Sequence, residues 1–140
     1  MQTVHVQRDF TAPVDRLYAY LSVHENLATI FPTRAERVRD GETEPNGVGS
    51  VRKLSFNGLL PFEETVTEAV PNERIEYRIT KGSPLRGHNG TMVFSENGAG
   101  GSHLDYTINF GAVVPGLDIV IAAALRRSIS QGLDKVAARL

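Results

Sequence analysis

The 140-residue sequence lacks cysteine and tryptophan, contains only two methionines, and has almost no net charge. Without cysteine the chain cannot form disulfides, use a thiol nucleophile or hold zinc through thiolates. Its 15 lysine and arginine residues are offset by 16 aspartate and glutamate residues, for a formal net charge of -1. Such a balance gives no long-range attraction to phosphate backbones, so we do not expect a nucleic-acid partner.

Long hydrophobic runs are missing as well. The first ten residues, MQTVHVQRDF, lack the basic start and the apolar stretch of a signal peptide, and no segment reaches transmembrane length. We therefore expect a cytoplasmic protein without a membrane span, either a monomer or a homodimer. The length, with 41% hydrophobic and 22% charged residues, is typical of a single globular domain over residues 1–140.

Motifs of several enzyme classes are also absent. There is no Gly-x-Ser-x-Gly nucleophile elbow and no Gly-x-x-x-x-Gly-Lys phosphate loop. His5, His24 and His103 are scattered, with no partner at metal-ligand spacing, so we expect no metal site. Nothing in the sequence predicts a cofactor.

The N-terminal segment has the pattern of a strand followed by two short helices. Hydrophobic and polar residues alternate from Val4 to Phe10, which is the period of a strand. Pro13 fits the first turn of a helix, and apolar residues follow at helical spacing up to Leu21. A second helix from Glu25 to Ile30 is expected to end before Pro32.

The middle of the chain predicts short strands joined by turns, which is typical of an antiparallel meander. Asn57-Gly58 is a hairpin signal between two of these strands. The expected strands are Thr33 to Arg39, Gly49 to Phe56, Phe62 to Val70, Arg74 to Thr80, His88 to Ser95 and Ser102 to Gly111.

From Pro115 to Leu140 the hydrophobic period becomes helical. A helix of roughly 24 residues would be about 36 Å long, enough to cross a small domain. The order of elements predicts an α+β helix-grip fold, in which a curved antiparallel sheet of about six or seven strands surrounds the long C-terminal helix. The inward face of that helix is formed by Ile121, Ala122, Leu125, Ile129, Leu133, Val136 and Leu140.

Three segments carry a resemblance to a known superfamily: Val4–Leu21, Gly47–Arg52 and Gly100–Tyr106, followed by the terminal helix. Their order resembles the START-like (SRPBCC) superfamily of START lipid-transfer domains, polyketide cyclases and birch-pollen-allergen-like proteins. Length and layout look most like its bacterial polyketide cyclase/lipid-transport branch. The resemblance implies a hydrophobic cavity between sheet and helix for lipids, polyketides or isoprenoid-like molecules. Aromatic polyketide cyclases usually have a tryptophan near the second helix, and this chain has none.

Arg52 and Glu64 are the strongest candidates for polar residues in such a cavity. Arg52 shares a strand face with Leu54, and Glu64 shares one with Val66. With a three-residue loop the two charges are directly opposite each other, and with a five-residue loop they are diagonal neighbours. They are interpreted as an anchor for a ligand carbonyl or hydroxyl, as an acid/base pair, or as a structural ion pair at the rim.

Other candidates line the same interior. His88 begins a predicted strand, where a solvated histidine is favoured over a proton donor or gate residue. Tyr77 and Tyr106 are either core residues whose hydroxyls are bonded nearby or, around an open cavity, directing groups for a ligand. The remaining candidates are apolar or small: Phe56, Met92 and Phe110 from the sheet, and Leu125, Ile129 and Gly132 from the helix.

Gly132 is unusual because it lies on the inward face of the long helix, where glycine costs about 1 kcal/mol relative to alanine. Either the helix backbone passes close to a bulky side chain of the sheet, or the glycine leaves room for a ligand.

The sequence therefore favours binding or transport of a small hydrophobic ligand. A cyclase or dehydratase that uses Arg52, Glu64, His88 or a tyrosine is the first alternative. A protein-interaction module of the same superfamily is the second.

Overall fold

The computed structural model describes residues 1–56 and 58–140, without the side chains of Phe56 and Leu59. Asn57, the first residue of the predicted hairpin turn, lies outside the described residues. The elements are β1 (Gln2–Phe10), α1 (Val14–Ser22), the 3₁₀ helix η1 (His24–Thr29), β2 (Arg34–Arg39), β3 (Val51–Phe56), β4 (Leu59–Val70), β5 (Arg74–Lys81), β6 (Leu85–Glu96), β7 (Ser102–Ala112) and α2 (Leu117–Arg139).

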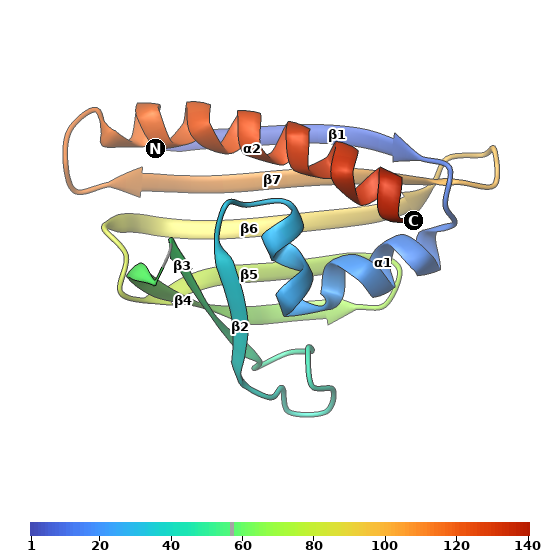
Figure 1. Cartoon of the computed structure of the whole chain (residues 1–140), viewed down its shortest axis with the longest axis horizontal. Coiled ribbons are helices and arrows are strands. Elements are labelled where there is room, and N and C mark those ends of the chain that lie inside the picture. The colour runs from blue at the N-terminus through green and yellow to red at the C-terminus, as the bar shows by residue number, and fades with distance from the viewer. Residues whose placement is uncertain (57) are drawn as a thin grey trace.

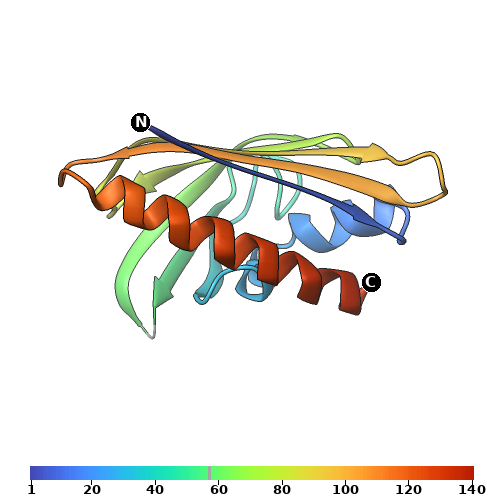
Figure 2. The same cartoon turned by 90° about the horizontal axis from the view of Figure 1, so that it is seen from above.

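The strands form one seven-stranded antiparallel sheet in the order β1-β7-β6-β5-β4-β3-β2. The long helix α2 runs along β1 and β7 (Figure 1). Seen from above, α1, η1 and α2 all lie on the same side of the sheet, which bends toward them at its β3–β4 end (Figure 2). The α+β helix-grip fold predicted from the sequence is confirmed.

Burial follows the predicted periodicities. Every second residue of β7 from Ser102 to Phe110 is buried, as expected for a sheet with one covered face. On α2 the buried residues are Ala122, Ile129, Gly132, Leu133 and Val136, whereas Ile121 and Leu125 are only half-buried. The second half of α2 therefore closes the core more tightly than the first half.

Two strands begin three residues earlier than predicted. β4 starts at Leu59 rather than Phe62, and β6 starts at Leu85 rather than His88. Leu85 pairs with Ala112 across to β7, and the register then shifts between Arg86 and Asn89. His88 therefore lies at an irregularity inside β6 and not at its start. The second predicted helix is present as η1, which is a 3₁₀ helix.

Gly132 allows α2 to approach the end of η1. A Cβ added at Gly132 would lie 2.8 Å from the carbonyl oxygen of Ile30 and 3.0 Å from its carbonyl carbon. One turn earlier, the Ser128 hydroxyl donates a hydrogen bond of 2.8 Å to the same Ile30 oxygen. The close approach is thus to the backbone of Ile30 rather than to a sheet side chain, and the space beside Gly132 is filled by protein instead of being left for a ligand.

Replacing Gly132 with alanine should destabilise the fold by about 1–3 kcal/mol, because the methyl group would overpack against the Ile30 backbone. Urea-induced unfolding measures this loss. Ser130→Ala, at an exposed position of the same helix, is the control and should change stability by no more than about 0.5 kcal/mol. An alanine variant at 132 as stable as the wild type would contradict the close contact.

Candidate ligand-binding site

The inner face of the sheet contains a buried ion pair between Arg52 of β3 and Glu64 of β4. The two residues are directly opposite in the strand register. The Nε of Arg52 donates a hydrogen bond of 2.7 Å to Oε1 of Glu64, and the residues are only 4% and 7% exposed. The pairing predicted from strand periodicity is therefore present, in its directly opposite form. Both side chains face inward because Leu54 and Val66, two residues further along each strand, are core residues.

A second partner of Arg52 comes from the 3₁₀ helix. The Nη1 group of Arg52 lies 3.1 Å from Nδ1 of His24, and Nε2 of His24 lies 2.8 Å from the hydroxyl oxygen of Ser50. Since a guanidinium can only donate, Nδ1 of His24 accepts, and Nε2 carries the proton that is donated to Ser50. Burial, reinforced by the Arg52 cation, lowers the pKa of His24 to about 4, so its imidazole is neutral near pH 7.

His24 and Ser50 were missed by the sequence analysis, which treated His24 as one of several scattered histidines. The Arg52–His24 contact joins residues 28 positions apart, and neither strand nor helix spacing brings them together. The signal available in the sequence was the spacing of Ser50, two residues before Arg52 in the predicted strand Gly49 to Phe56; in the structure Ser50 is completely buried. A small hydroxyl beside an inward-facing arginine indicates a polar network rather than a lone ion pair.

His88 is buried against Glu64, so the prediction of a solvated histidine at a strand end is wrong. Its side chain is 6% exposed, and its Nε2 lies 3.8 Å from Oε2 of Glu64. The backbone N–H of Ile79 donates a hydrogen bond of 3.1 Å to Nδ1 of His88, which leaves the proton of the neutral ring on Nε2, facing Glu64. Burial lowers the pKa of His88, the Arg52 charge lowers it further, and Glu64 opposes the shift.

Tyr77 and Tyr106 complete the polar group. Their hydroxyls are hydrogen-bonded to each other. The guanidinium carbon of Arg52 lies 4.3 Å from the centroid of the Tyr77 ring, a cation–π contact. Position 90 must be glycine to admit that ring, since a Cβ there would overlap it. Burial raises the pKa of both phenols, so both stay protonated.

We refer to these seven residues as the Arg52 cluster: His24, Ser50, Arg52, Glu64, Tyr77, His88 and Tyr106. It contains one cation and one anion, and its histidines and tyrosines are uncharged near pH 7. Within the described residues, Nη2 of Arg52 is buried without a hydrogen bond, although it lies 2.7 Å from Oε1 of Glu64. The only contact described for Oε2 of Glu64 is with His88, at 3.8 Å. Among the described residues, the cluster therefore retains one donor, Nη2 of Arg52, and one acceptor, Oε2 of Glu64, to which no hydrogen bond is assigned.

The other residues predicted to line a ligand cavity are not part of the Arg52 cluster. Met92 is 1% exposed, and Phe110 and Ile129 are 0% exposed, so they pack as core next to the Arg52 cluster and border no open space. Leu125 is half-buried. The side chain of Phe56 lies outside the described residues, and its predicted lining role stays a prediction. Gly132 packs against Ile30, as described above.

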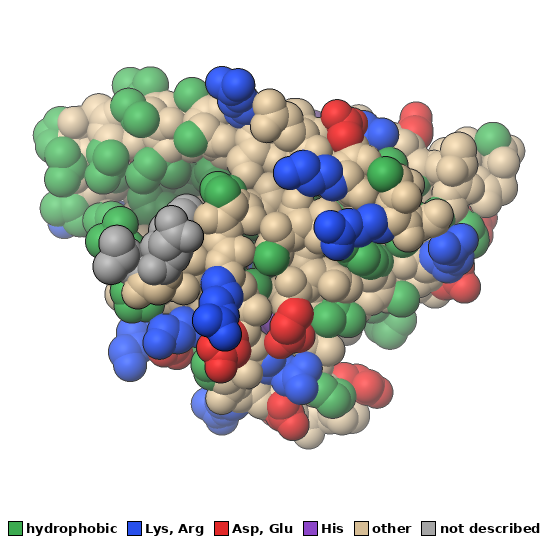
Figure 3. All heavy atoms as spheres, in the orientation of Figure 1, with side chains coloured by type: hydrophobic (Ala, Val, Ile, Leu, Met, Phe, Trp, Pro, Cys, Tyr) green, Lys and Arg blue, Asp and Glu red, His purple; other side chains and the backbone are tan. Residues whose placement is uncertain are grey.

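β4, β6 and α2 all begin at one end of the molecule (Figure 1), and four hydrophobic residues in these elements are half-buried. We call this the apolar end, formed by Phe62, Leu85, Ile121 and Leu125, each of which packs against the core. Hydrophobic surface at this end continues below the start of α2, deeper in the view (Figure 3). Phe62 lies two residues before Glu64 on the same face of β4, so at this residue the apolar end adjoins the Arg52 cluster.

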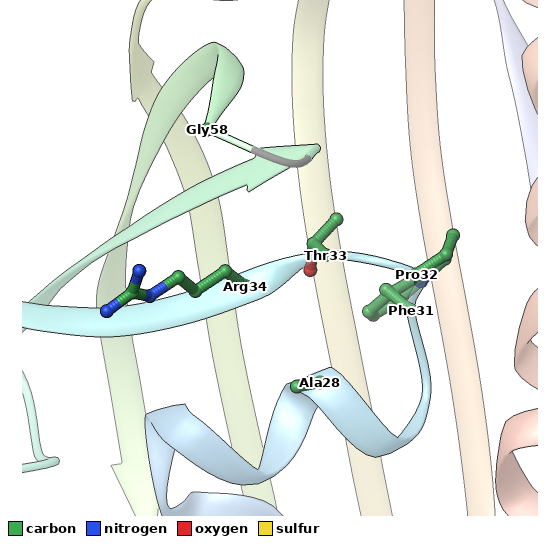
Figure 4. Close-up of a pocket in the computed structure, with 6 residues that line it drawn as sticks. All are labelled: Ala28, Phe31, Pro32, Thr33, Arg34 and Gly58. Carbon is green, nitrogen blue, oxygen red and sulfur yellow. The ribbon is translucent and has the colours of Figure 1, made fainter.

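Two surface pockets are lined by residues of η1, β2, β3 and the β3–β4 turn. One, of about 550 Å³, is lined by Ala28, Phe31, Pro32, Thr33, Arg34 and Gly58 (Figure 4). The other, of about 210 Å³, is lined by the polar residues Arg34, Glu36, Lys53 and Ser55 together with Gly58. Neither includes a member of the Arg52 cluster.

The fold agrees with comparisons to known proteins. The model of the family described as polyketide cyclase / dehydrase and lipid transport matches residues 1–140, and the chain belongs to this family. No curated protein matches the sequence.

Solved structures show the same fold at low sequence identity. A protein from Thermobifida fusca is 14% identical, with a TM-score of 0.79, covering 99% of this chain and 93% of its own. One from Thermus thermophilus is 18% identical, with a TM-score of 0.77 and coverages of 99% and 96%. A third, from Nitrosospira multiformis, is 18% identical, with a TM-score of 0.73 and coverages of 98% and 94%.

Two other features are absent from the described part of the chain. None of its helices combines the length and the hydrophobicity needed to cross a bilayer. Its histidine, aspartate and glutamate side chains form no group of three or more that could hold a metal ion.

Replacing Glu64 with glutamine should destabilise the protein by roughly 3–5 kcal/mol, because Arg52 would remain buried without its counter-charge. Glu63→Gln is the matched control. Glu63 is on the opposite face of β4, and its contact with the exposed Lys81 is 3.9 Å, so its loss should cost at most about 1 kcal/mol. A double-mutant cycle with Arg52→Met measures the coupling, and a coupling energy near zero would place the two charges in solvent.

Stability should fall on acidification partly through His24. Its folded-state pKa of about 4 lies below the ordinary value of 6.5, so between these values the unfolded chain binds more protons. The contribution is complete above about pH 6.5 and is lost as the pH falls toward 4. Urea unfolding at pH 7 and pH 4.5 should show a smaller loss for His24→Gln than for the wild type. His5→Gln, on the exposed edge strand, is the control for removal of an imidazole. If the wild type and His24→Gln lose the same unfolding free energy between pH 7 and pH 4.5, His24 is not responsible for the acid sensitivity.

Proposed function

We propose that this protein binds a small hydrophobic ligand at the apolar end, beneath the first half of α2, with the Arg52 cluster holding the ligand's polar group. The observation that carries this proposal is the buried cluster itself. A buried polar group normally has its hydrogen-bonding capacity satisfied, yet Nη2 of Arg52, although it lies 2.7 Å from Oε1 of Glu64, has no contact with hydrogen-bond geometry among the described residues. The neighbouring apolar surface is incompletely buried, and the family includes lipid-transport proteins. Ligand sites commonly combine apolar walls with a few polar groups of this kind.

The packing of the core affects where the ligand is placed. Met92 and Phe110 of the sheet and Ile129 of α2 are fully enclosed, so a ligand between them would have to displace core side chains. Leu85 and Leu125 are half-buried and require much less rearrangement. The proposed site is therefore nearer the start of α2 than the sequence predicted.

A cyclase or dehydratase activity is the second candidate, favoured by the Glu64–His88 pair. A carboxylate and a neutral imidazole 3.8 Å apart could accept and donate a proton at one substrate carbon or oxygen. In that case Glu64 acts as the base and His88, through Nε2–H, as the acid.

Ligand binding can be measured with the uncharged dye 1-N-phenylnaphthylamine, whose fluorescence should rise on binding and fall when long-chain alcohols or polycyclic aromatics displace it. Leu125→Asn should weaken binding by about fivefold or more, because it buries an amide without a partner. Ile119→Asn is the control on the same helix, at a side chain that is 62% exposed, and should bind like the wild type.

If neither the dye nor any member of a lipid and aromatic panel binds, the proposal fails. Native mass spectrometry of protein purified from its own host would identify a co-purifying ligand directly.

A further inference from the structure

We propose that the Arg52 cluster selects a ligand whose polar end is uncharged, such as an alcohol or a phenol, and rejects the carboxylate of a fatty acid. This inference rests on the proposed ligand-binding function and specifies the chemistry of the ligand. It follows from the charge balance and from the free hydrogen-bonding positions of the cluster.

The positive charge of Arg52 is already balanced by the carboxylate of Glu64. An arginine that recognises a carboxylate ligand presents its planar N–H groups to that ligand. Here Nε donates to Oε1 of Glu64, Nη2 lies 2.7 Å from the same oxygen, and Nη1 faces Nδ1 of His24 at 3.1 Å. The guanidinium is also stacked on the Tyr77 ring. No net positive charge remains for a second carboxylate.

Two neighbouring arginines, Arg37 and Arg8, do not supply a free positive charge in place of Arg52. Arg37, which is opposite Arg52 in the register, is paired with Asp40 at 3.0 Å. Arg8, on the inner side of β1, is paired with Asp134 of α2. His24 faces Arg52 and His88 faces Glu64, both as neutral rings, because burial and the arginine charge disfavour their protonation. A ligand carboxylate would therefore meet Glu64 without a compensating charge, and like charges repel strongly in a buried site.

The positions left open suit a hydroxyl group. Oε2 of Glu64 can accept a hydrogen bond, and Nε2 of His88, 3.8 Å away, carries a proton that can be donated. Nη2 of Arg52 is a further buried donor without a hydrogen bond among the described residues. An alcohol or phenol donates one hydrogen bond and accepts another, so it can satisfy Glu64 and one of these donors together. A carboxylate can only accept.

The test compares ligands that differ only in their polar group. 1-Decanol and decanoate compete against 1-N-phenylnaphthylamine at pH 8, where the acid is ionised. The wild-type protein should bind decanol at least tenfold more tightly than decanoate. Equal or tighter binding of decanoate overturns the inference while leaving the proposed function intact. Binding of neither compound, nor of the dye, overturns both.

Glu64→Gln provides the decisive variant. It frees the Arg52 charge, so decanoate should bind at least tenfold more tightly than it does to the wild type. Glu63→Gln makes the same change of net charge on the opposite face of β4 and should leave the preference for decanol unchanged. A folded Glu64→Gln protein with the wild-type preference would overturn the inference.

Because Glu64→Gln is expected to be destabilised, the double variant Arg52→Met with Glu64→Gln is tested beside it. This variant has no buried charge, so it should fold and should not gain affinity for decanoate. A gain as large as that of the single variant would show that the arginine is not the group that recognises the acid, and would also contradict the proposal.

Discussion

The Arg52–Glu64 pair imposes a constraint that the rest of the interior must satisfy. Removing two charges from water costs several kcal/mol each, and the cost is offset only when the charges meet with good geometry and their remaining polar atoms are bonded. In this protein the compensating groups come from separate parts of the chain: His24 from η1, Ser50 from the segment before β3, and Tyr77 from β5. The pair therefore ties the curved end of the sheet to the short helices that cover it.

The two halves of the long helix α2 pack differently against the core. Its second half is closely packed, since Gly132 and Ser128 bring it against the backbone of Ile30. Its first half, which also runs along β1 and β7, leaves Ile121 and Leu125 half-buried. In the proposed site, the polar cluster and this less complete apolar packing together suit a ligand with one polar end and an apolar body.

Local periodicity was sufficient to predict the fold and part of the site. The alternation on β3 and β4 placed Arg52 and Glu64 on one face, and the 3.6-residue period of α2 identified its inward side. His24 was not predicted, because its contact with Arg52 depends on how η1 packs over the sheet. His88 was misassigned because β6 begins three residues earlier and changes register beside it. The reason for Gly132 also required the structure, because its neighbour Ile30 belongs to a different element.

The central claim is that ligand contacts the Arg52 cluster through the apolar end. Side-chain NMR of protein labelled with nitrogen-15 tests it most directly, by following the Nε–H of Arg52 and the ring nitrogens of His88 during titration with 1-decanol. Both sets of signals, together with the Leu85 and Leu125 methyl groups, should shift along one saturable curve. Saturable binding that shifts only residues around the surface pocket at Ala28 and Arg34, and leaves Arg52 and His88 unchanged, would contradict the account.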